Sequence, residues 1–378
     1  MNAIRIGIIT RNFPPLKGGM ERLNEQIFHL LNNGFDCQLF GPAGCEEFAP
    51  ENRARGSTVS PTPIFLFLSF VRGLLFYLLN PRPQVIIGGS GLVAPVVLAL
   101  SGLFRARSVV MIHGLDIIVK SRLYRWFFLP CIQRADLVVS NSENTKRLAV
   151  NHGINENRIV IIPPGVEKPE SKLDKTAAKK HYEAADIPIL LSVGRLIPRK
   201  GLPEFIREAL PSIVKANPAT EFWIAGTEPA RALNKNTYSV QEKIEGAIEE
   251  TGLSANVKLL GRVDDEELRS LYAAADVFIF PLVETPGDVE GFGMVAVEAG
   301  IYGTPTVAFN CGGVSDAISH GVSGYLVEPE DYMGFVDAVH LATQTLKPES
   351  VIDFANNFLW DCYGPKLDKE INALVGSR

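Results

Sequence analysis

The sequence alternates short apolar runs with segments of helical periodicity, and it does so in two successive series. Continuous apolar runs are typical of strands covered on both faces, and their alternation with helices predicts parallel sheets built from βαβ units. The expected strands of the first series span residues 4–10, 36–41, 84–88, 108–112, 136–140 and 158–162. Those of the second series span residues 187–194, 221–226, 257–260, 276–281, 305–309 and 324–327.

A chain of 378 residues exceeds what one hydrophobic core usually organises, so the two series predict two domains. We expect an α/β architecture of two Rossmann-like, doubly wound domains that face a central cleft, with ligands at the carboxyl ends of the strands. The expected bounds are 1–165 for the N-terminal, acceptor-binding domain and 187–355 for the C-terminal, nucleotide-sugar-binding domain. The polar stretch 166–186 is expected to connect them, and a C-terminal helix in 356–378 to pack back on the first domain.

Cysteine usage and the first residues indicate a cytoplasmic protein. The five cysteines are scattered without a C-x-x-C pair, which argues against a disulfide framework or a zinc site. Residues 1–10 alternate like a strand, and no cleavage site follows an apolar run, so no signal peptide is expected. The most apolar stretch, 64–79, is 16 residues long and contains Arg72. Because a spanning helix needs about 20 apolar residues, we expect it not to cross a bilayer.

Positive charge is concentrated in the first half of the chain, although the net charge is −5. Between Arg53 and Arg134 there are ten Lys or Arg residues and one acid, Asp116. Such asymmetry predicts an acidic partner. Arg125 lies among aromatic residues in the apolar segment 124–129, so we expect an anionic membrane surface and no nucleic acid. The alternative is that both apolar stretches form the core of the first domain.

The strongest chemical signal is the segment Glu290-Gly-Phe-Gly-Met-Val-Ala-Val-Glu298, which follows the expected strand 276–281. Gly291 and Gly293 permit close backbone approach, and a helix beginning near Met294 would offer free amides to an anion such as a diphosphate. The helix is otherwise apolar, so the Glu298 carboxylate needs a partner. Sugar hydroxyls would serve, and the alternative is a structural ion pair with a core arginine.

This segment resembles the E-x₇-E motif of the retaining glycosyltransferases of family 4, which have the GT-B fold. Further elements follow in the family's order over nearly the whole chain, and they are specific only in combination. They are Phe13–Glu21 after the first strand, His113-Gly114, Asn141-Ser142-Glu143, Gly194–Gly201, Leu260–Val263, Gly312-Gly313 and Gly324. Two positions depart from the pattern: Pro164 stands where Asn often precedes the glycine, and Asp316 where Glu is common. These departures leave the acceptor details open.

The resemblance implies donor-binding roles in the second half. Arg195 and Lys200, five residues apart in a loop, resemble the family's diphosphate clamp, although the loop with Arg199 could instead be solvated. Glu290 resembles the carboxylate that binds donor-sugar hydroxyls, and Glu298 the one that binds ribose. The remaining implied donor-binding positions are the amides of Gly291, Phe292, Gly293, Met294 and Val295, and the backbone of Arg262 and Val263.

In the first half the resemblance implies one catalytic residue. His113 ends an apolar strand and would support transfer near the donor sugar, although a lone histidine can also be a satisfied core residue. Gly18 and Gly19 would let the first loop approach the diphosphate and acceptor, or they could form only a tight turn. Asp116 is a candidate acceptor contact. Glu290 completes the expected catalytic set.

We therefore expect a metal-independent hexosyltransferase that uses a UDP- or GDP-linked sugar and no cofactor. No D-x-D triplet occurs, and the segment Asp288-Val289-Glu290 resembles that of some mannosyltransferases, which implies a GDP donor. The expected acceptor is lipid-linked or an envelope glycan at the inner face of the membrane, and the oligomeric state stays open. The alternatives are a sugar-nucleotide epimerase of the same architecture or a non-catalytic sugar-nucleotide-binding module. A dehydrogenase is disfavoured because Gly88-Gly-Ser-Gly91 is an incomplete dinucleotide fingerprint.

Overall fold

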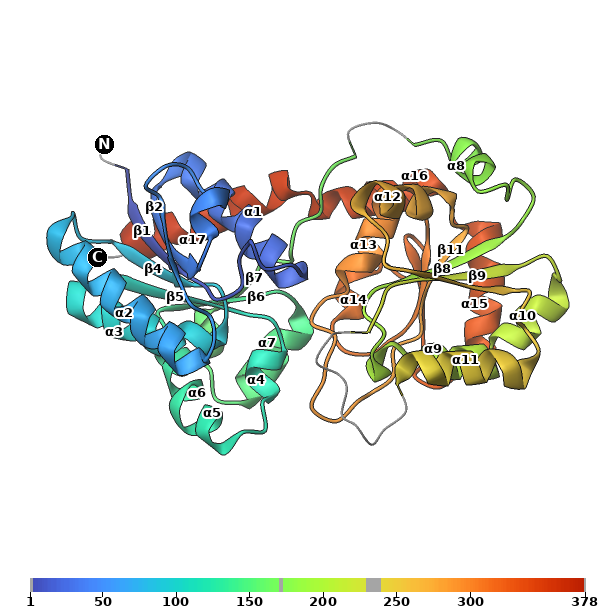
Figure 1. Cartoon of the computed structure of the whole chain (residues 1–378), viewed down its shortest axis with the longest axis horizontal. Helices are drawn as coiled ribbons and strands as arrows, with labels where there is room; N and C mark the ends of the chain where they lie inside the picture. Colours follow the sequence, from blue (N-terminus) through green and yellow to red (C-terminus); the bar gives the residue numbers. More distant parts are fainter. Residues whose placement is uncertain (1–2, 170–172, 229–238, 377–378) are drawn as a thin grey trace. The chain divides into compact units, whose positions relative to one another are not determined.

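The computed structural model describes residues 3–169, 173–228 and 239–376. By internal contacts the chain divides into two compact units (Figure 1). Unit 1 comprises Met1–Gly165 together with Trp360–Arg378, and unit 2 comprises Val166–Leu359. Each unit contains one parallel sheet with helices on both faces, as the alternating sequence pattern predicts.

Unit 1 contains a seven-stranded parallel sheet in the order β3-β2-β1-β4-β5-β6-β7. Its strands are β1 (Arg5–Ile9), β2 (Asp36–Pro42), β3 (Ala54–Ser57), β4 (Val85–Gly88), β5 (Arg107–Ile112), β6 (Leu137–Ser140) and β7 (Ile159–Ile161). Its helices are α1 (Gly19–Gly34), α2 (Thr62–Leu79), α3 (Ala94–Phe104), α4 (Leu115–Ile118), α5 (Arg122–Phe127), α6 (Leu129–Arg134), α7 (Glu143–Asn151) and α17 (Trp360–Gly376).

Both faces of this sheet are buried, and successive strand residues supply the two cores in turn. Ile8 and Ile87 contribute to the core under α1 and α17, whereas their neighbours Ile9 and Ile86 contribute to the core under α2, α3 and α6. Since side chains alternate across a strand, two apolar faces require an unbroken apolar run. The uniform strand patterns in the sequence have this origin.

Unit 2 contains a six-stranded parallel sheet in the order β10-β9-β8-β11-β12-β13. Its strands are β8 (Ile189–Val193), β9 (Glu221–Ala225), β10 (Val257–Gly261), β11 (Val277–Phe280), β12 (Thr306–Phe309) and β13 (Gly324–Val327). Its helices are α8 (Lys175–His181), α9 (Leu202–Glu208), α10 (Leu210–Ala216), α11 (Val240–Thr251), α12 (Asp265–Ala274), α13 (Met294–Ile301), α14 (Val314–Ala317), α15 (Tyr332–Thr345) and α16 (Pro348–Ala355).

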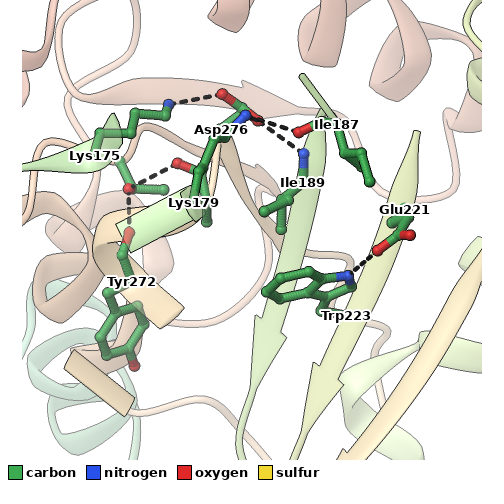
Figure 2. Close-up of polar contacts among 10 residues, drawn as sticks. Lys175, Lys179, Ile187, Ile189, Glu221, Trp223, Tyr272 and Asp276 are labelled. Atoms are coloured by element: carbon green, nitrogen blue, oxygen red, sulfur yellow. Dashed lines mark hydrogen bonds and ion pairs between the residues drawn. The ribbon is translucent and has the colours of Figure 1, made fainter. Parts of the chain in front are cut away.

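The polar segment 166–186, expected to connect the domains, forms part of unit 2. Residues 170–172 of it lie outside the described part of the chain. Val166 and Ala184 are buried in the core beneath α12 and α13. Lys175 and Lys179 of α8 form ion pairs with the two carboxylate oxygens of Asp276, at 2.8 and 2.6 Å (Figure 2). The lysines that make this segment look solvated in sequence therefore attach α8 to the amino end of β11.

The last helix, α17, packs against α1 of unit 1 although it follows all of unit 2 in sequence. Tyr363, Leu367 and Ile371 place one face of α17 in the unit 1 core. Trp360 at its start lies against Gly165, where any side chain would overlap the indole ring.

The strand order of each unit reverses at one position, between β1 and β4 in unit 1 and between β8 and β11 in unit 2. Loops that leave the carboxyl ends of such neighbouring strands diverge to opposite faces of the sheet, and the gap between them is where open α/β sheets bind ligands. The loops after β8 and β11 carry Arg195, Lys200 and Glu290. The topology thus assembles these sequence motifs at one edge of unit 2.

Candidate active site

The loop after β8 is turned inward by a short 3₁₀ helix, Pro198–Lys200, that ends at Gly201. Gly201 has φ 62°, and a Cβ there would overlap the carbonyl oxygen of Pro281 after β11. Glycine is required for both reasons. The Val283 amide also donates to the Arg199 carbonyl oxygen at 3.0 Å. These backbone contacts hold the loops after β8 and β11 against each other.

Two buried cations from this turn converge on Glu290. Lys200 Nζ lies 3.5 Å from Glu290 Oε2 and 4.3 Å from the centre of the Phe280 ring. Arg199 forms an ion pair with the same carboxylate oxygen, and its Nε lies 3.1 Å from Asp288 Oδ2. From its sequence alone, Arg199 was expected only as part of a loop that could be solvated, but its side chain is 7% exposed.

Burial and charge act in opposite directions on this cluster. Burial alone would raise the pKa of Glu290, but Lys200 and Arg199 hold that pKa below its ordinary value. Burial lowers the pKa of Lys200 despite the neighbouring Glu290. Glu290 is therefore ionised at neutral pH, and it is the main group that stabilises positive charge on Lys200.

Helix α13 begins beside the same cluster. Gly293 is its N-cap with φ 99°, and a Cβ there would lie 3.3 Å from the Phe280 ring. The helix starts at Met294, as predicted. The first amides of an α-helix have no acceptor within the helix, so Met294 and Val295 present donors at an end that favours anions. Phe292 is buried in the unit 2 core.

A second glycine pair, after β12, fixes the position of this loop. The Gly313 amide donates to the Glu290 carbonyl oxygen at 2.9 Å. A Cβ on Gly313 would overlap the Gly291 carbonyl oxygen, and one on Gly312 would lie 2.7 Å from the Glu290 carbonyl oxygen. Two backbone segments thus cross in contact, which only glycine permits.

Glu298 receives a hydrogen bond from the Tyr272 hydroxyl of α12 at 2.8 Å. Burial, together with Glu298, raises the pKa of Tyr272 well above its ordinary value, so the phenol keeps the proton that it donates. Glu298 itself is half-buried on α13. The sequence required a partner for this carboxylate, but did not identify Tyr272.

The other expected donor-binding residues lie on the same carboxyl edge. Arg195 and Arg262, which follow β8 and β10, are exposed, whereas Val263 is half-buried against the unit 2 core. The Gly226 amide donates to the Gly261 carbonyl oxygen at 2.7 Å, so the loops after β9 and β10 are joined.

In unit 1, His113 follows β5 and is held by the loop after β4. Its Nε2 lies 3.1 Å from the Gly89 carbonyl oxygen, and because a carbonyl only accepts, Nε2 carries a proton. Its main-chain amide donates to Asp116 Oδ2 at 3.0 Å. Burial raises the pKa of Asp116, although His113 and neighbouring amides oppose that rise. Asp116 thereby positions the backbone of His113.

The glycines of the first loop begin α1. Gly18 is the N-cap residue, and a Cβ there would overlap a carboxylate oxygen of Glu21. The other Glu21 oxygen accepts a hydrogen bond from Asn12 Nδ2 at 2.7 Å. A Cβ on Gly19 would meet no atom within 4 Å. In the first loop, the Glu21 side chain therefore fills the space beside Gly18, whereas the space beside Gly19 is empty.

Two family models match this chain. The model described as "Glycosyltransferase Family 4" matches residues 17–168, and that described as "Glycosyl transferases group 1" matches residues 174–351. Solved structures give the fold: that of Anabaena HepE in complex with UDP has a TM-score of 0.80 at 19% identity, covering 98% of this chain and 100% of the other. Sucrose-phosphate synthase from Thermosynechococcus elongatus has a TM-score of 0.76 at 21% identity, covering 99% and 100%.

Two curated relatives are similar to this chain in sequence, one over most of its length and the other over about half. A "GDP-mannose-dependent alpha-(1-6)-phosphatidylinositol monomannoside mannosyltransferase" of Mycolicibacterium smegmatis is 28% identical, over 90% of this chain and 88% of the relative. A "D-inositol 3-phosphate glycosyltransferase" of Geodermatophilus obscurus is 32% identical over 61% of this chain. The chain spans about half, 51%, of that relative's length.

Fold, site topology and these matches define a GT-B enzyme, a hexosyltransferase that uses a nucleotide sugar. The fold class predicted from the sequence is confirmed. The chain belongs to glycosyltransferase family 4.

Proposed function

We propose that this enzyme transfers a hexose from a nucleoside diphosphate to an acceptor hydroxyl with retention, giving an α-glycoside. The observation that carries the proposal is the convergence of Lys200, Arg199 and Glu290 beside the start of α13 at the β8/β11 switch point. A diphosphate needs fixed cations and free amides, and a sugar needs an ionised carboxylate. This edge of unit 2 contains both.

Each expected donor-binding residue has a role consistent with its surroundings. Arg195 and Lys200 stabilise charge that develops on the leaving diphosphate, with the α13 amides on the distal phosphate. Glu290, kept ionised by Arg199, accepts hydrogen bonds from sugar hydroxyls. Glu298, oriented by Tyr272, accepts those of the ribose. The backbone of Arg262 and Val263 contacts the base.

The proposed reaction is a same-face displacement that requires no metal ion. The bond between the anomeric carbon and the phosphate oxygen breaks as the acceptor oxygen bonds to the same face of that carbon. The leaving phosphate oxygen takes the acceptor proton. His113 supports the sugar during transfer. Asp116 positions His113 by accepting a hydrogen bond from the main-chain amide of His113.

We favour GDP-mannose as donor and a lipid-linked or envelope glycan as acceptor at the inner membrane surface. The name of the M. smegmatis relative specifies GDP-mannose and a phosphatidylinositol monomannoside. The acidic pair Asp288 and Glu290 also favours GDP. The basic first half of the chain is compatible with an acceptor in an anionic membrane.

A thermal-shift panel of UDP, GDP, ADP and their sugars tests donor binding. A ligand at about 100 times its dissociation constant adds about 2.7 kcal/mol to the free energy of unfolding, so the nucleotide that binds should raise the unfolding temperature measurably. Lys200→Met should abolish that shift, and Lys243→Met on the exposed face of α11 serves as the matched control. No shift with any nucleotide contradicts the proposal.

Product analysis then separates the alternatives. An α linkage by NMR from an α donor supports retention, and a β linkage contradicts it. Conversion of the nucleotide sugar without acceptor would indicate an epimerase, and binding without any conversion a non-catalytic module. His113→Asn should lower kcat with little change in donor KM, because the substitution removes an interaction made in the transition state.

A further inference from the structure

Helix α2 of unit 1 presents an apolar face to solvent. It is the one described helix that is long and apolar enough to cross a membrane by length and composition, yet only 22% of its residues are buried. Phe67, Leu78 and Leu79 leave 64%, 64% and 85% of their surface exposed. Some apolar residues of α2 are exposed or half-buried and do not pack against the unit 1 core; they recur at helical spacing and are Ile64, Phe67, Leu68, Val71, Leu75, Leu78 and Leu79. We call this set the outer stripe of α2.

The opposite face of α2 fixes the helix to unit 1. Phe65 and Tyr77 are buried in the core shared with α3, and Gly73 packs against Leu100 of α3. A helix that spanned a bilayer would have to withdraw these side chains from the core. The outer stripe therefore suits a helix that lies in an interface plane.

An open pocket of about 400 Å³ lies at the amino ends of β5 and β6, beside the end of α3. Three arginines line it, Arg105, Arg107 and Arg134, against one carboxylate, Asp136. That carboxylate accepts hydrogen bonds from the Ser108 amide and hydroxyl, at 2.9 and 2.7 Å, and it pairs with Arg107. Positive charge is thus in excess.

A buried hydroxyl in the pocket wall supports an anionic ligand. Ser101 is 5% exposed, and its Oγ has no hydrogen-bond partner among residues 3–169, 173–228 and 239–376. A buried hydroxyl without a partner costs free energy, and a phosphate oxygen that displaced the pocket wall enough to reach Oγ would recover it by accepting its hydrogen bond.

The pocket lies on the helix that packs against α2, near the point where the chain leaves α2. α2 and α3 pack side by side (Figure 1), and Leu103, 58% exposed, is two residues before Arg105. α2 ends at Leu79, and the chain enters β4 through Gln84, whose carbonyl oxygen accepts from the Arg107 amide at 2.8 Å. Exposed apolar side chains beside cations match the apolar and anionic layers of a lipid leaflet.

We propose that this surface docks unit 1 on an anionic lipid bilayer, with the outer stripe of α2 in the interface and a phosphate-bearing headgroup in the arginine pocket. The pocket lies at the amino ends of the strands, opposite to the carboxyl edge that carries His113. It is therefore a separate site, and it needs no nucleotide.

Sedimentation of the full chain with lipid vesicles, without donor or acceptor, tests this surface. We expect binding to phosphatidylglycerol-rich vesicles and weak binding to pure phosphatidylcholine vesicles. R105Q/R134Q should lower the affinity about thirtyfold, at about 1 kcal/mol per cation near an anionic surface. F67S/L78S should lower it at least as far. The matched controls in unit 2, K243Q/R269Q and M333S/L341S, should bind like wild type.

Thermal unfolding of each variant separates lost docking from lost folding. Vesicle binding of R105Q/R134Q at wild-type affinity would overturn the proposed role of the arginine pocket in headgroup binding. Vesicle binding of F67S/L78S at wild-type affinity would overturn the proposed insertion of the outer stripe of α2. Equal binding to neutral and anionic vesicles would also overturn the proposal. So would stabilisation by inorganic phosphate through the arginines without any vesicle binding. Because no nucleotide is present, failure here is distinct from failure of the nucleotide panel.

Discussion

The ammonium of Lys200 lies 3.5 Å from the carboxylate of Glu290 and 4.3 Å from the centre of the Phe280 ring, whose face it contacts. Arg199 neutralises the same carboxylate, so Glu290 keeps a partner if Lys200 turns toward a diphosphate. The cluster can therefore release one cation to a ligand without leaving a buried charge unpaired.

Lys200→Met should lower kcat/KM about 10²- to 10³-fold, a loss comparable to removing one fixed group that stabilises transition-state charge. Because burial disfavours the charged lysine and lowers its pKa, the substitution should cost little stability. Steady-state kinetics and thermal unfolding measure the two effects. A large loss of stability with activity preserved in the folded fraction would contradict the assigned role.

Tyr272→Phe should raise the donor KM about tenfold with little change in kcat. The change removes a hydrogen bond to the Glu298 carboxylate, and such bonds contribute about 1.5–3 kcal/mol. The control is Tyr302→Phe, which is expected to leave the donor KM unchanged. The rings of Tyr302 and Tyr272 are stacked with their centres 6.1 Å apart. Equal KM values for wild type and Tyr272→Phe would show that Glu298 does not need this donor.

Gly313→Ala should abolish donor binding while leaving the protein folded. The added methyl would overlap the Gly291 carbonyl oxygen, so the loop from Glu290 to Gly293, which begins α13, must shift away from Gly313. Gly246→Ala in the middle of α11 has open space and should add about 0.5–1 kcal/mol of stability. The nucleotide-induced thermal shift distinguishes the two substitutions. A normal shift in Gly313→Ala would show that the loop position does not control binding.

The strands were predictable because burial on both faces leaves a continuous apolar run, and all twelve expected strands are present. The thirteenth, β3, has the sequence Ala-Arg-Gly-Ser and no such run. It is the edge strand beside β2, and although three of its four residues are buried, its small or polar side chains form no apolar run. Periodicity carries no signal for a strand of this kind.

Local sequence singled out Glu290, Gly293 and Lys200 as candidate site residues, but it did not identify the residues that contact them. Arg199 is turned inward by backbone contact between Gly201 and Pro281, which lie 80 positions apart. Tyr272 meets Glu298 only when α12 packs beside α13. These pairings depend on tertiary contacts. A signal was available at Tyr272, since its phenol falls on an otherwise apolar helix face and needs an acceptor.

Asp276 connects α8 to β11, and its environment predicts how the stability of unit 2 depends on pH. Its carboxylate pairs with Lys175 and Lys179 and accepts from the Ile189 amide at 2.8 Å (Figure 2). Although burial would raise the pKa of Asp276, these partners lower it below its ordinary value of 3.8. A carboxyl whose folded pKa is depressed stabilises the fold above the unfolded pKa, about 3.9, and this contribution is lost as pH falls through the lower folded value.

Asp276→Asn should therefore cost about 2 kcal/mol near neutral pH, because it leaves two lysines facing a neutral amide. The difference from wild type should shrink as the solution is acidified, since the wild-type carboxyl then becomes protonated as well. Hydrogen exchange of the Ile189 amide reports this contact directly, and Asp337→Asn on the exposed face of α15 controls for loss of a surface charge. A difference that is constant from neutral to strongly acidic pH would mean that the ion pairs of α8 contribute nothing to folding.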